Sequence, residues 1–232
     1  MKGTIYLIPS PLGDTDIDKV IPQGVTGVIA SLKHFVVEDI RTARRYLSKA
    51  GLKGRIDTLN FYTLNEHTPD SAVEEYIKIA AAGEGMGMIS EAGLPAVADP
   101  GAKLVELAHK EGIKVVPLSG PSSIFLALMA SGMNGQSFAF RGYLPVKSEA
   151  RREAIREIER LSDQKGQTQI IIETPYRNNA LLNDILQVCR KGKLLCIAAS
   201  VTTDQEFIKT MTIGEWQNHL PELNKKPAIF IL

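Results

Sequence analysis

Short runs of apolar residues alternate along the first half of the chain with longer stretches in which apolar residues recur every three or four positions. The short runs are typical of buried strands and the longer stretches of amphipathic helices. The pattern predicts strands at residues 3–8, 34–37, 57–62, 86–89 and 113–116. It predicts helices at residues 41–50, 71–82 and 101–111. Strands that alternate with helices indicate a mostly parallel sheet with helices on both faces.

The second half of the chain has a different pattern. Helices are expected at residues 122–130, 148–161 and 178–189, the first strongly apolar and the second highly charged. Strands are expected at residues 138–140, 170–172, 194–199, 206–213 and 228–232, in a mixed sheet. The predicted fold class is therefore α/β, with one lobe over residues 1–116 and a second over residues 117–232. A cleft between two packed lobes is a natural ligand site.

Composition and charge exclude several classes of protein. The 232 residues include 27 Lys+Arg and 26 Asp+Glu, and 44% are hydrophobic, which is the balance of a globular protein. A formal charge of +1 argues against non-specific nucleic-acid binding by the whole surface, although a local basic patch stays possible. With two cysteines and no apolar run of about 20 residues, a cytoplasmic protein without a membrane partner is expected. The cysteines and the four histidines lack the spacing of zinc ligands, so no metal is expected.

Four loops after the expected strands of the first lobe concentrate glycine and proline, at residues 8–13, 90–95, 99–101 and 118–123. In an open parallel sheet, ligands bind beyond the carboxyl ends of the strands. Glycine there lets the backbone approach a ligand closely. Any one of these loops is more often a simple turn, but four on one edge favour a nucleotide-like ligand.

Charged residues beside the second expected strand form another candidate group. Glu38 and Asp39 follow this strand, where carboxylates can orient a hydroxyl, and Arg41 can hold a phosphate. The alternative is that the acids stabilise a helix N-terminus through its dipole, and the sequence leaves both interpretations open. No acid interrupts the basic residues between Arg41 and Arg55, so this stretch is the better candidate for contact with nucleic acid.

Six motifs occur in order along the chain: IPSPLGD, VEDIRTARRYL, ISEAGLPAVADPG, VVPLSGPSS, FRGYLPVKSEAR and IETPYR. Together they resemble the ribosomal RNA small-subunit methyltransferase I type, the cytidine 2′-O-methyltransferase branch of the tetrapyrrole methylase superfamily. The resemblance implies an S-adenosylmethionine-dependent enzyme of two α/β lobes with the cofactor in the cleft between them, commonly a homodimer. The implied substrate is ribosomal RNA, methylated at a ribose 2′-hydroxyl. The chain departs from the family pattern at Ile40, Glu91 and Leu94.

The resemblance also implies site residues. The expected cofactor-binding residues are Pro9, Gly13, Ser90, Glu91, Ala92, Gly93, Ser119, Gly120 and Ser122. A ribose hydroxyl acceptor benefits from a base or an oriented hydrogen bond. The candidates for this catalytic role are Glu38, Asp39 and His67. The candidates for binding the RNA substrate are Arg41, Arg44 and Arg45.

Two other functions stay open at this point. The first is a methyltransferase of the same fold that acts on a tetrapyrrole, another small molecule or a protein, for which a deep cleft without phosphate-binding arginines is expected. The second is a non-enzymatic protein that binds the cofactor or RNA. An RNA methyltransferase instead predicts a basic rim supplied by Arg41, Arg44 and Arg45.

Overall fold

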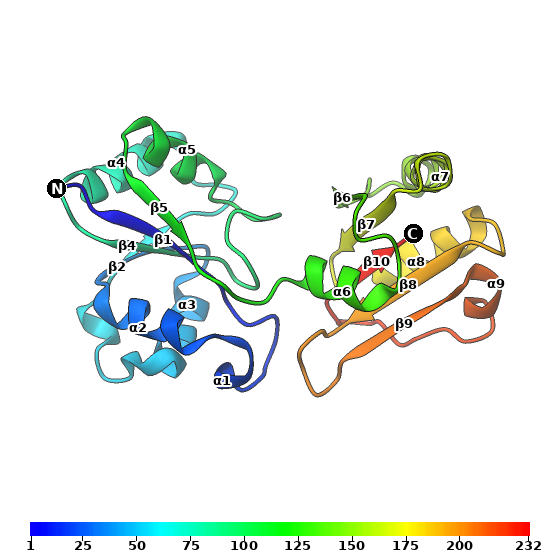
Figure 1. The fold of residues 1–232 in the computed structure, drawn as a ribbon, viewed down its shortest axis with the longest axis horizontal. Coiled ribbons are helices and arrows are strands. Elements are labelled where there is room, and N and C mark those ends of the chain that lie inside the picture. The colour runs from blue at the N-terminus through cyan, green and yellow to red at the C-terminus, as the bar shows by residue number, and fades with distance from the viewer. The chain divides into compact units, whose positions relative to one another are not determined.

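The computed structural model describes all 232 residues, which divide into two compact units, Met1–Ser122 and Ser123–Leu232. Figure 1 shows an α/β arrangement in each unit, as predicted. The predicted boundary after residue 116 falls inside the last strand of the first unit, β5 (Lys114–Pro117). The loop after β5 stays with the first unit because Leu118 N–H donates to Leu7 O at 3.0 Å.

The first unit contains a five-stranded sheet in the order β3-β2-β4-β1-β5. Its other strands are β1 (Thr4–Ile8), β2 (His34–Val37), β3 (Asn60–Thr63) and β4 (Met86–Ile89). Every pairing is parallel, which confirms the predicted parallel sheet. All five carboxyl ends therefore lie at one edge of the sheet.

Helices cover both faces of this sheet (Figure 1). Helices α2 (Gln23–Ser31) and α3 (Ile40–Leu47) pack on one face, and α4 (Asp70–Ala81) and α5 (Ala102–Lys110) on the other. Strand periodicity explains the division, because successive side chains point to opposite faces. In β1, Ile8 joins the core under α2 and α3, whereas Ile5 joins the core under α4 and α5.

Several short elements near the site differ from the predicted pattern. Helix α1 (Ile17–Val20) and α2 were not predicted; α2 contains two glycines, which are poor helix formers, so its periodicity is weak. The helix expected to run to residue 50 ends as an α-helix at Leu47 and continues as the π-helical turn η1 (Ser48–Leu52). A 3₁₀ turn, η2 (Ile56–Thr58), occupies the start of the expected third strand. Of these elements, α1, η1 and η2 contribute residues to the pocket described below.

The second unit contains a mixed five-stranded sheet in the order β6-β7-β10-β8-β9, as predicted. The strands are β6 (Phe138–Gly142), β7 (Thr168–Glu173), β8 (Leu194–Ala199), β9 (Phe207–Thr212) and β10 (Ala228–Ile231). The helices are α6 (Ser123–Ser131), α7 (Ser148–Lys165), α8 (Asn178–Val188) and α9 (Ile213–Trp216). The apolar faces of α7, α8 and α9 share one core with strands β7, β8 and β10. No helix in either unit is both long and apolar enough to cross a bilayer.

A buried ion pair fixes α7 to α8. The Arg151 guanidinium lies 2.6 Å from the Asp184 carboxylate, and both side chains are buried. Arg152 Nε also donates to Asp184 at 2.7 Å, and Ser148 Oγ contributes a further hydrogen bond. Although burial opposes it, hydrogen bonds from these arginines and Ser148 hold the pKa of Asp184 below its usual value. The charged helix predicted here is therefore anchored by its buried face.

We expect Asp184→Ala to lower the free energy of unfolding by about 3 kcal/mol, because it leaves the buried Arg151 without a counterion. Denaturant unfolding measures this change. The control is Glu157→Ala, which removes an exposed partner of Arg160 on the same helix and should leave the midpoint almost unchanged. Equal effects of the two substitutions would contradict the anchoring role of Asp184.

Candidate functional site

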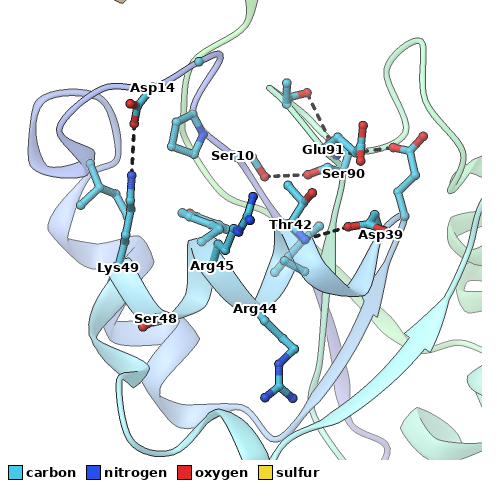
Figure 2. Close-up of a pocket in the computed structure, with 18 of the residues that line it drawn as sticks. Ser10, Asp14, Asp39, Thr42, Arg44, Arg45, Ser48, Lys49, Ser90 and Glu91 are labelled. Atoms are coloured by element: carbon cyan, nitrogen blue, oxygen red, sulfur yellow. Dashed lines mark hydrogen bonds and ion pairs between the residues drawn. The ribbon is translucent and has the colours of Figure 1, made fainter.

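A pocket of about 770 Å³ lies in the first unit, at the carboxyl ends of β1, β2 and β4. Its walls come from the loop after β1, from the end of β2 with helix α3, and from the loop after β4 (Figure 2). Pockets of roughly 300–1,000 Å³ are typical of sites for small molecules and cofactors. The pocket therefore lies where ligands of open parallel sheets bind.

Backbone hydrogen bonds join the loop after β1 to the loop after β4. Ser10 N–H donates to Gly93 O at 2.8 Å, and Gly93 N–H donates back to Ser10 O at 3.1 Å. The Ser10 hydroxyl also donates to the carbonyl of Ser90 at 2.8 Å (Figure 2). The two loops consequently form one unit of the site.

Two glycines allow this arrangement. Gly93 has a φ of +76°, which residues with a side chain rarely adopt. Gly120, in the loop after β5, lies against the ring of Pro9, where an added Cβ would sit 2.2 Å from the Pro9 Cβ. Ser119 and Ser122 flank this contact in the chain. The loops after β1, β4 and β5 thus meet at one edge of the sheet, as their glycine content predicted.

Tyr46 ties helix α3 to the same edge. Its side chain is buried, and its hydroxyl donates to the carbonyl of Pro9 at 2.7 Å. Burial raises the pKa of Tyr46, so the phenol stays protonated and keeps this hydrogen bond. Sequence analysis missed this residue. The signal that could have found it is the helical spacing of Thr42, Tyr46 and Lys49, which share the face of the helix that lines the pocket.

Three carboxyl groups gather at the acidic side of the site. Glu38 is half-buried at the end of β2, and its Oε2 accepts a hydrogen bond from Glu91 N–H at 3.4 Å. Burial and the nearby charge of Asp99 raise the pKa of Glu38, against the hydrogen bond from Glu91. Burial likewise raises the pKa of Asp99, with a smaller contribution from the charge of Glu91. None of the three forms an ion pair with a lysine or arginine, so together they favour a cationic ligand.

Asp39 has a structural role at the start of α3. Its Oδ1 accepts a hydrogen bond from Thr42 N–H at 2.7 Å, which makes Asp39 the N-cap of the helix. This hydrogen bond is the largest cause that lowers the pKa of Asp39. Asp39 also lines the pocket. The helix-terminus interpretation therefore accounts for Asp39, whereas Glu38 keeps a free carboxylate oxygen.

The three predicted substrate arginines have different surroundings. Arg45 lines the pocket and pairs with no other residue of the protein. Arg44 contributes to the lining, but its guanidinium is held by Asp57 at 2.5 Å and lies over the ring of Phe61. Figure 2 shows the two side chains directed to opposite sides of α3. Arg41 is exposed and does not line the pocket.

The structure thus brings most of the predicted site residues to one place. Those that line the pocket are Gly13, Glu38, Asp39, Arg44, Arg45, Ser90, Glu91 and Ala92. Pro9, Gly93 and Gly120 pack at the same sheet edge. His67 does not line the pocket, and its side chain is exposed with Nε2 3.4 Å from Glu66.

Comparison with known proteins identifies the family. The sequence model for Tetrapyrrole (Corrin/Porphyrin) Methylases matches residues 4–217. The chain belongs to this family. Two similar curated proteins, both called ribosomal RNA small subunit methyltransferase I, come from Vibrio cholerae and Escherichia coli O157:H7. The first is 32% identical over 91% of this chain and 69% of the relative, and the second 30% identical over 92% and 71%.

Solved structures agree on the fold of this methylase. The methyltransferase CobJ superposes with a TM-score of 0.66 at 17% identity, covering 99% of this chain and 93% of CobJ. A uroporphyrin-III C-methyltransferase from Thermus thermophilus, solved with S-adenosylhomocysteine, gives a TM-score of 0.60 at 16% identity, covering 99% and 96%. At these identities the likeness shows the fold. The family and the curated relatives show the activity: the protein is an S-adenosylmethionine-dependent methyltransferase, as its motifs implied.

The residues of the pocket fit this cofactor. S-adenosylmethionine carries a positive sulfonium and an ammonium group, and the site offers Glu38, Glu91 and Asp99 without protein counterions. Gly93 and Gly120 let the loops after β1, β4 and β5 come together at this edge, since an added Cβ would meet Leu12 at 3.2 Å and Pro9 at 2.2 Å. The acidic groups suit the positive charges of this cofactor, and a pocket of about 770 Å³ is of the size that cofactors occupy.

We expect Gly120→Ala to lower the free energy of unfolding by roughly 1–3 kcal/mol, because the new methyl group would overlap the Pro9 ring. It should also weaken the binding of S-adenosylmethionine, measured by calorimetry. Gly27→Ala in helix α2 is the control, since nothing lies within 4 Å of its added Cβ. That substitution should raise stability slightly without any effect on the cofactor. Unchanged melting of Gly120→Ala would contradict the close contact.

The raised pKa of Glu38 predicts a pH dependence of stability. The ordinary pKa of a glutamate is 4.5, and above this pH the unfolded chain releases the proton of Glu38 while the folded protein still holds it. The contribution of Glu38 to stability therefore falls as the pH rises from 4.5 through the raised pKa. Glu38→Gln should therefore gain stability relative to the wild type between pH 4 and pH 7. Urea unfolding at both pH values measures the difference. Glu74→Gln, an exposed change on α4, should show no such trend.

Proposed function

We propose that this methylase transfers a methyl group from S-adenosylmethionine to a ribose 2′-hydroxyl of ribosomal RNA. The observation that carries the proposal is the similarity, over about nine-tenths of the chain, to curated proteins named ribosomal RNA small subunit methyltransferase I. The unpaired Arg45 at the pocket gives independent support, because an RNA substrate needs cations for its phosphates. A tetrapyrrole acceptor has no comparable support beyond the shared fold.

In this proposal the loops at the sheet edge bind the cofactor. The residues assigned to it are Pro9, Gly13, Ser90, Glu91, Ala92, Gly93, Ser119, Gly120 and Ser122. When bound, S-adenosylmethionine supplies a methyl carbon activated by its sulfonium. Ser10 keeps the loops after β1 and β4 in a fixed relation through its three hydrogen bonds. Such preorganisation can supply roughly 7–11 kcal/mol of the barrier in a transfer between two bound groups.

Glu38 is the group that we assign to the proton of the acceptor hydroxyl. Burial raises its pKa toward the range in which a carboxylate is an effective base, and it lines the pocket. The hydroxyl oxygen forms a bond to the methyl carbon as the carbon–sulfur bond breaks, and its proton passes to Glu38. Asp39 supports this step by capping α3, which fixes the position of the preceding residue.

We further propose that the protein works as a homodimer in the cytoplasm, where ribosomal RNA is available. The apolar surface of α6 supports an interface between two copies. Phe125 is 52% exposed and Met129 77% exposed on this helix. The ring of Phe138 lies edge-on to Phe125, with centroids 6.0 Å apart, which extends the patch onto β6. Exposed apolar clusters of this kind are typical of interaction surfaces.

Methyl transfer to ribosomal RNA tests the proposal directly. Small ribosomal subunits from a strain lacking this gene are incubated with the protein and methyl-labelled S-adenosylmethionine, and the RNA is digested to nucleosides. We expect the label in a 2′-O-methylnucleoside. Label on a base, or label only in a small-molecule fraction, would overturn the proposal.

The same assay tests the role of Glu38. Glu38→Gln should lower kcat at saturating S-adenosylmethionine about 10²–10⁴-fold, because general-base assistance is lost. Glu74→Gln should retain the rate of the wild type. A rate for Glu38→Gln close to that of the wild type would remove Glu38 from the chemical step and leave the identity of the substrate unaffected.

A further inference from the structure

The pocket has two sides of opposite charge. Glu38 and Glu91 form one side, at the ends of β2 and β4. Arg45 and Lys49 form the other, on α3 and the turn η1 that continues it. Figure 2 shows Glu91 and Asp39 at one end of the site and Lys49, paired with Asp14, at the other, with Arg45 between them. A methyltransferase has to bring a cationic donor and a nucleophilic acceptor together. The acidic side of the pocket suits the cationic donor, and the basic side suits an acceptor that carries phosphate.

Arg45 is the cation most available to a ligand on the basic side. It lines the pocket, is exposed, and forms no ion pair or hydrogen bond with the protein. Lys49 is paired only with Asp14, at 3.3 Å, and both of these side chains are largely exposed. A pair of that kind contributes little to stability, so Lys49 can exchange Asp14 for a stronger partner. Arg44, in contrast, is held by Asp57 at the shorter distance of 2.5 Å and also lies over the ring of Phe61.

An apolar surface adjoins these cations. Ile17, Ala43 and Ile56 line the pocket together with Arg45, and Ser48 adds a hydroxyl. The apolar side chains come from α1, α3 and the turn η2, the short elements of the first unit. A flat aromatic base fits an apolar floor of this kind, and a guanidinium fork fits a phosphate through two parallel hydrogen bonds.

We propose that the α3 side of this pocket is a binding site for one nucleotide of the acceptor RNA, with the phosphate on Arg45 and the base on the apolar floor. The inference rests on the proposed function and deepens it. It selects Arg45 from a run of basic residues, and it excludes Arg41, which lies outside the lining, and Arg44, which is committed to Asp57. The nucleotide site and the acidic donor side then share one pocket.

The salt dependence of RNA binding tests the role of Arg45. Arg45→Ala should weaken the binding of a single-stranded RNA oligonucleotide about tenfold or more and lower the slope of log Kd against log salt by about 0.7–1. Arg41→Ala is the matched control, an exposed arginine on the same helix, and it should leave the slope unchanged. Because Arg45 is exposed, the melting temperature should not change. A slope for Arg45→Ala equal to that of the wild type would overturn the inference.

Free nucleotides provide a second test that does not depend on RNA. Calorimetry with the four nucleoside 5′-monophosphates and the corresponding nucleosides should show tighter binding of the phosphorylated forms to the wild type. In Arg45→Ala this preference should disappear, while the affinity for S-adenosylmethionine stays the same. A loss of S-adenosylmethionine binding instead would place Arg45 in the donor site and overturn the inference.

The two proposals fail in different ways. If the wild type labels ribosomal RNA but Arg45→Ala retains its slope and its preference for monophosphates, the nucleotide site is wrong and the proposed function stands. If the wild type labels no RNA but binds monophosphates through Arg45, the proposed function is wrong and the site is supported.

Discussion

The pair of backbone hydrogen bonds between Ser10 and Gly93 is the constraint on which the rest of the site depends. The loops after β1 and β4 would otherwise be independent connections, each with its own conformational freedom. Their pairing positions Ser90 and the start of the β4 loop beside the first loop. The contact of Gly120 with Pro9 then adds the loop after β5 to the same assembly. Three segments distant in the sequence are held at one edge by three hydrogen bonds of Ser10 and one contact that only glycine permits.

Charge is arranged around this framework at a cost in stability. The carboxyl groups of Glu38, Glu91 and Asp99 lie together without a basic partner, and burial, with a smaller contribution from their mutual charges, raises the pKa of Glu38 and of Asp99. Elsewhere the protein neutralises buried charge, as the pair between Arg151 and Asp184 shows. The acidic group of the first unit has no such basic partner, an arrangement that is common at functional sites.

Much of this structure follows from local features of the sequence. The continuous apolar run of β1 predicts a buried strand, and the glycine- and proline-rich loops predict the edge where the pocket lies. Helix α2 escaped prediction because its glycines weaken the periodic signal, and only its packing on the sheet stabilises it. The sequence also did not predict that Arg44 and Arg45, neighbours in the basic stretch, would have different partners. Gly51, at a φ of +99°, turns the chain inside η1. The residues that follow bring Asp57 to α3, where it forms an ion pair with Arg44 and not with Arg45. Contacts of this kind join residues that no local pattern relates.

The hydrogen bond from Tyr46 to Pro9 has a consequence for the rigidity of the pocket. Tyr46 lies on α3, which forms one wall, while Pro9 belongs to the loop after β1, which forms another. A movement of α3 away from this loop would break a buried hydrogen bond, and an unsatisfied buried polar group costs about 1–3 kcal/mol. The phenol at position 46 thus keeps two walls of the pocket at a fixed separation.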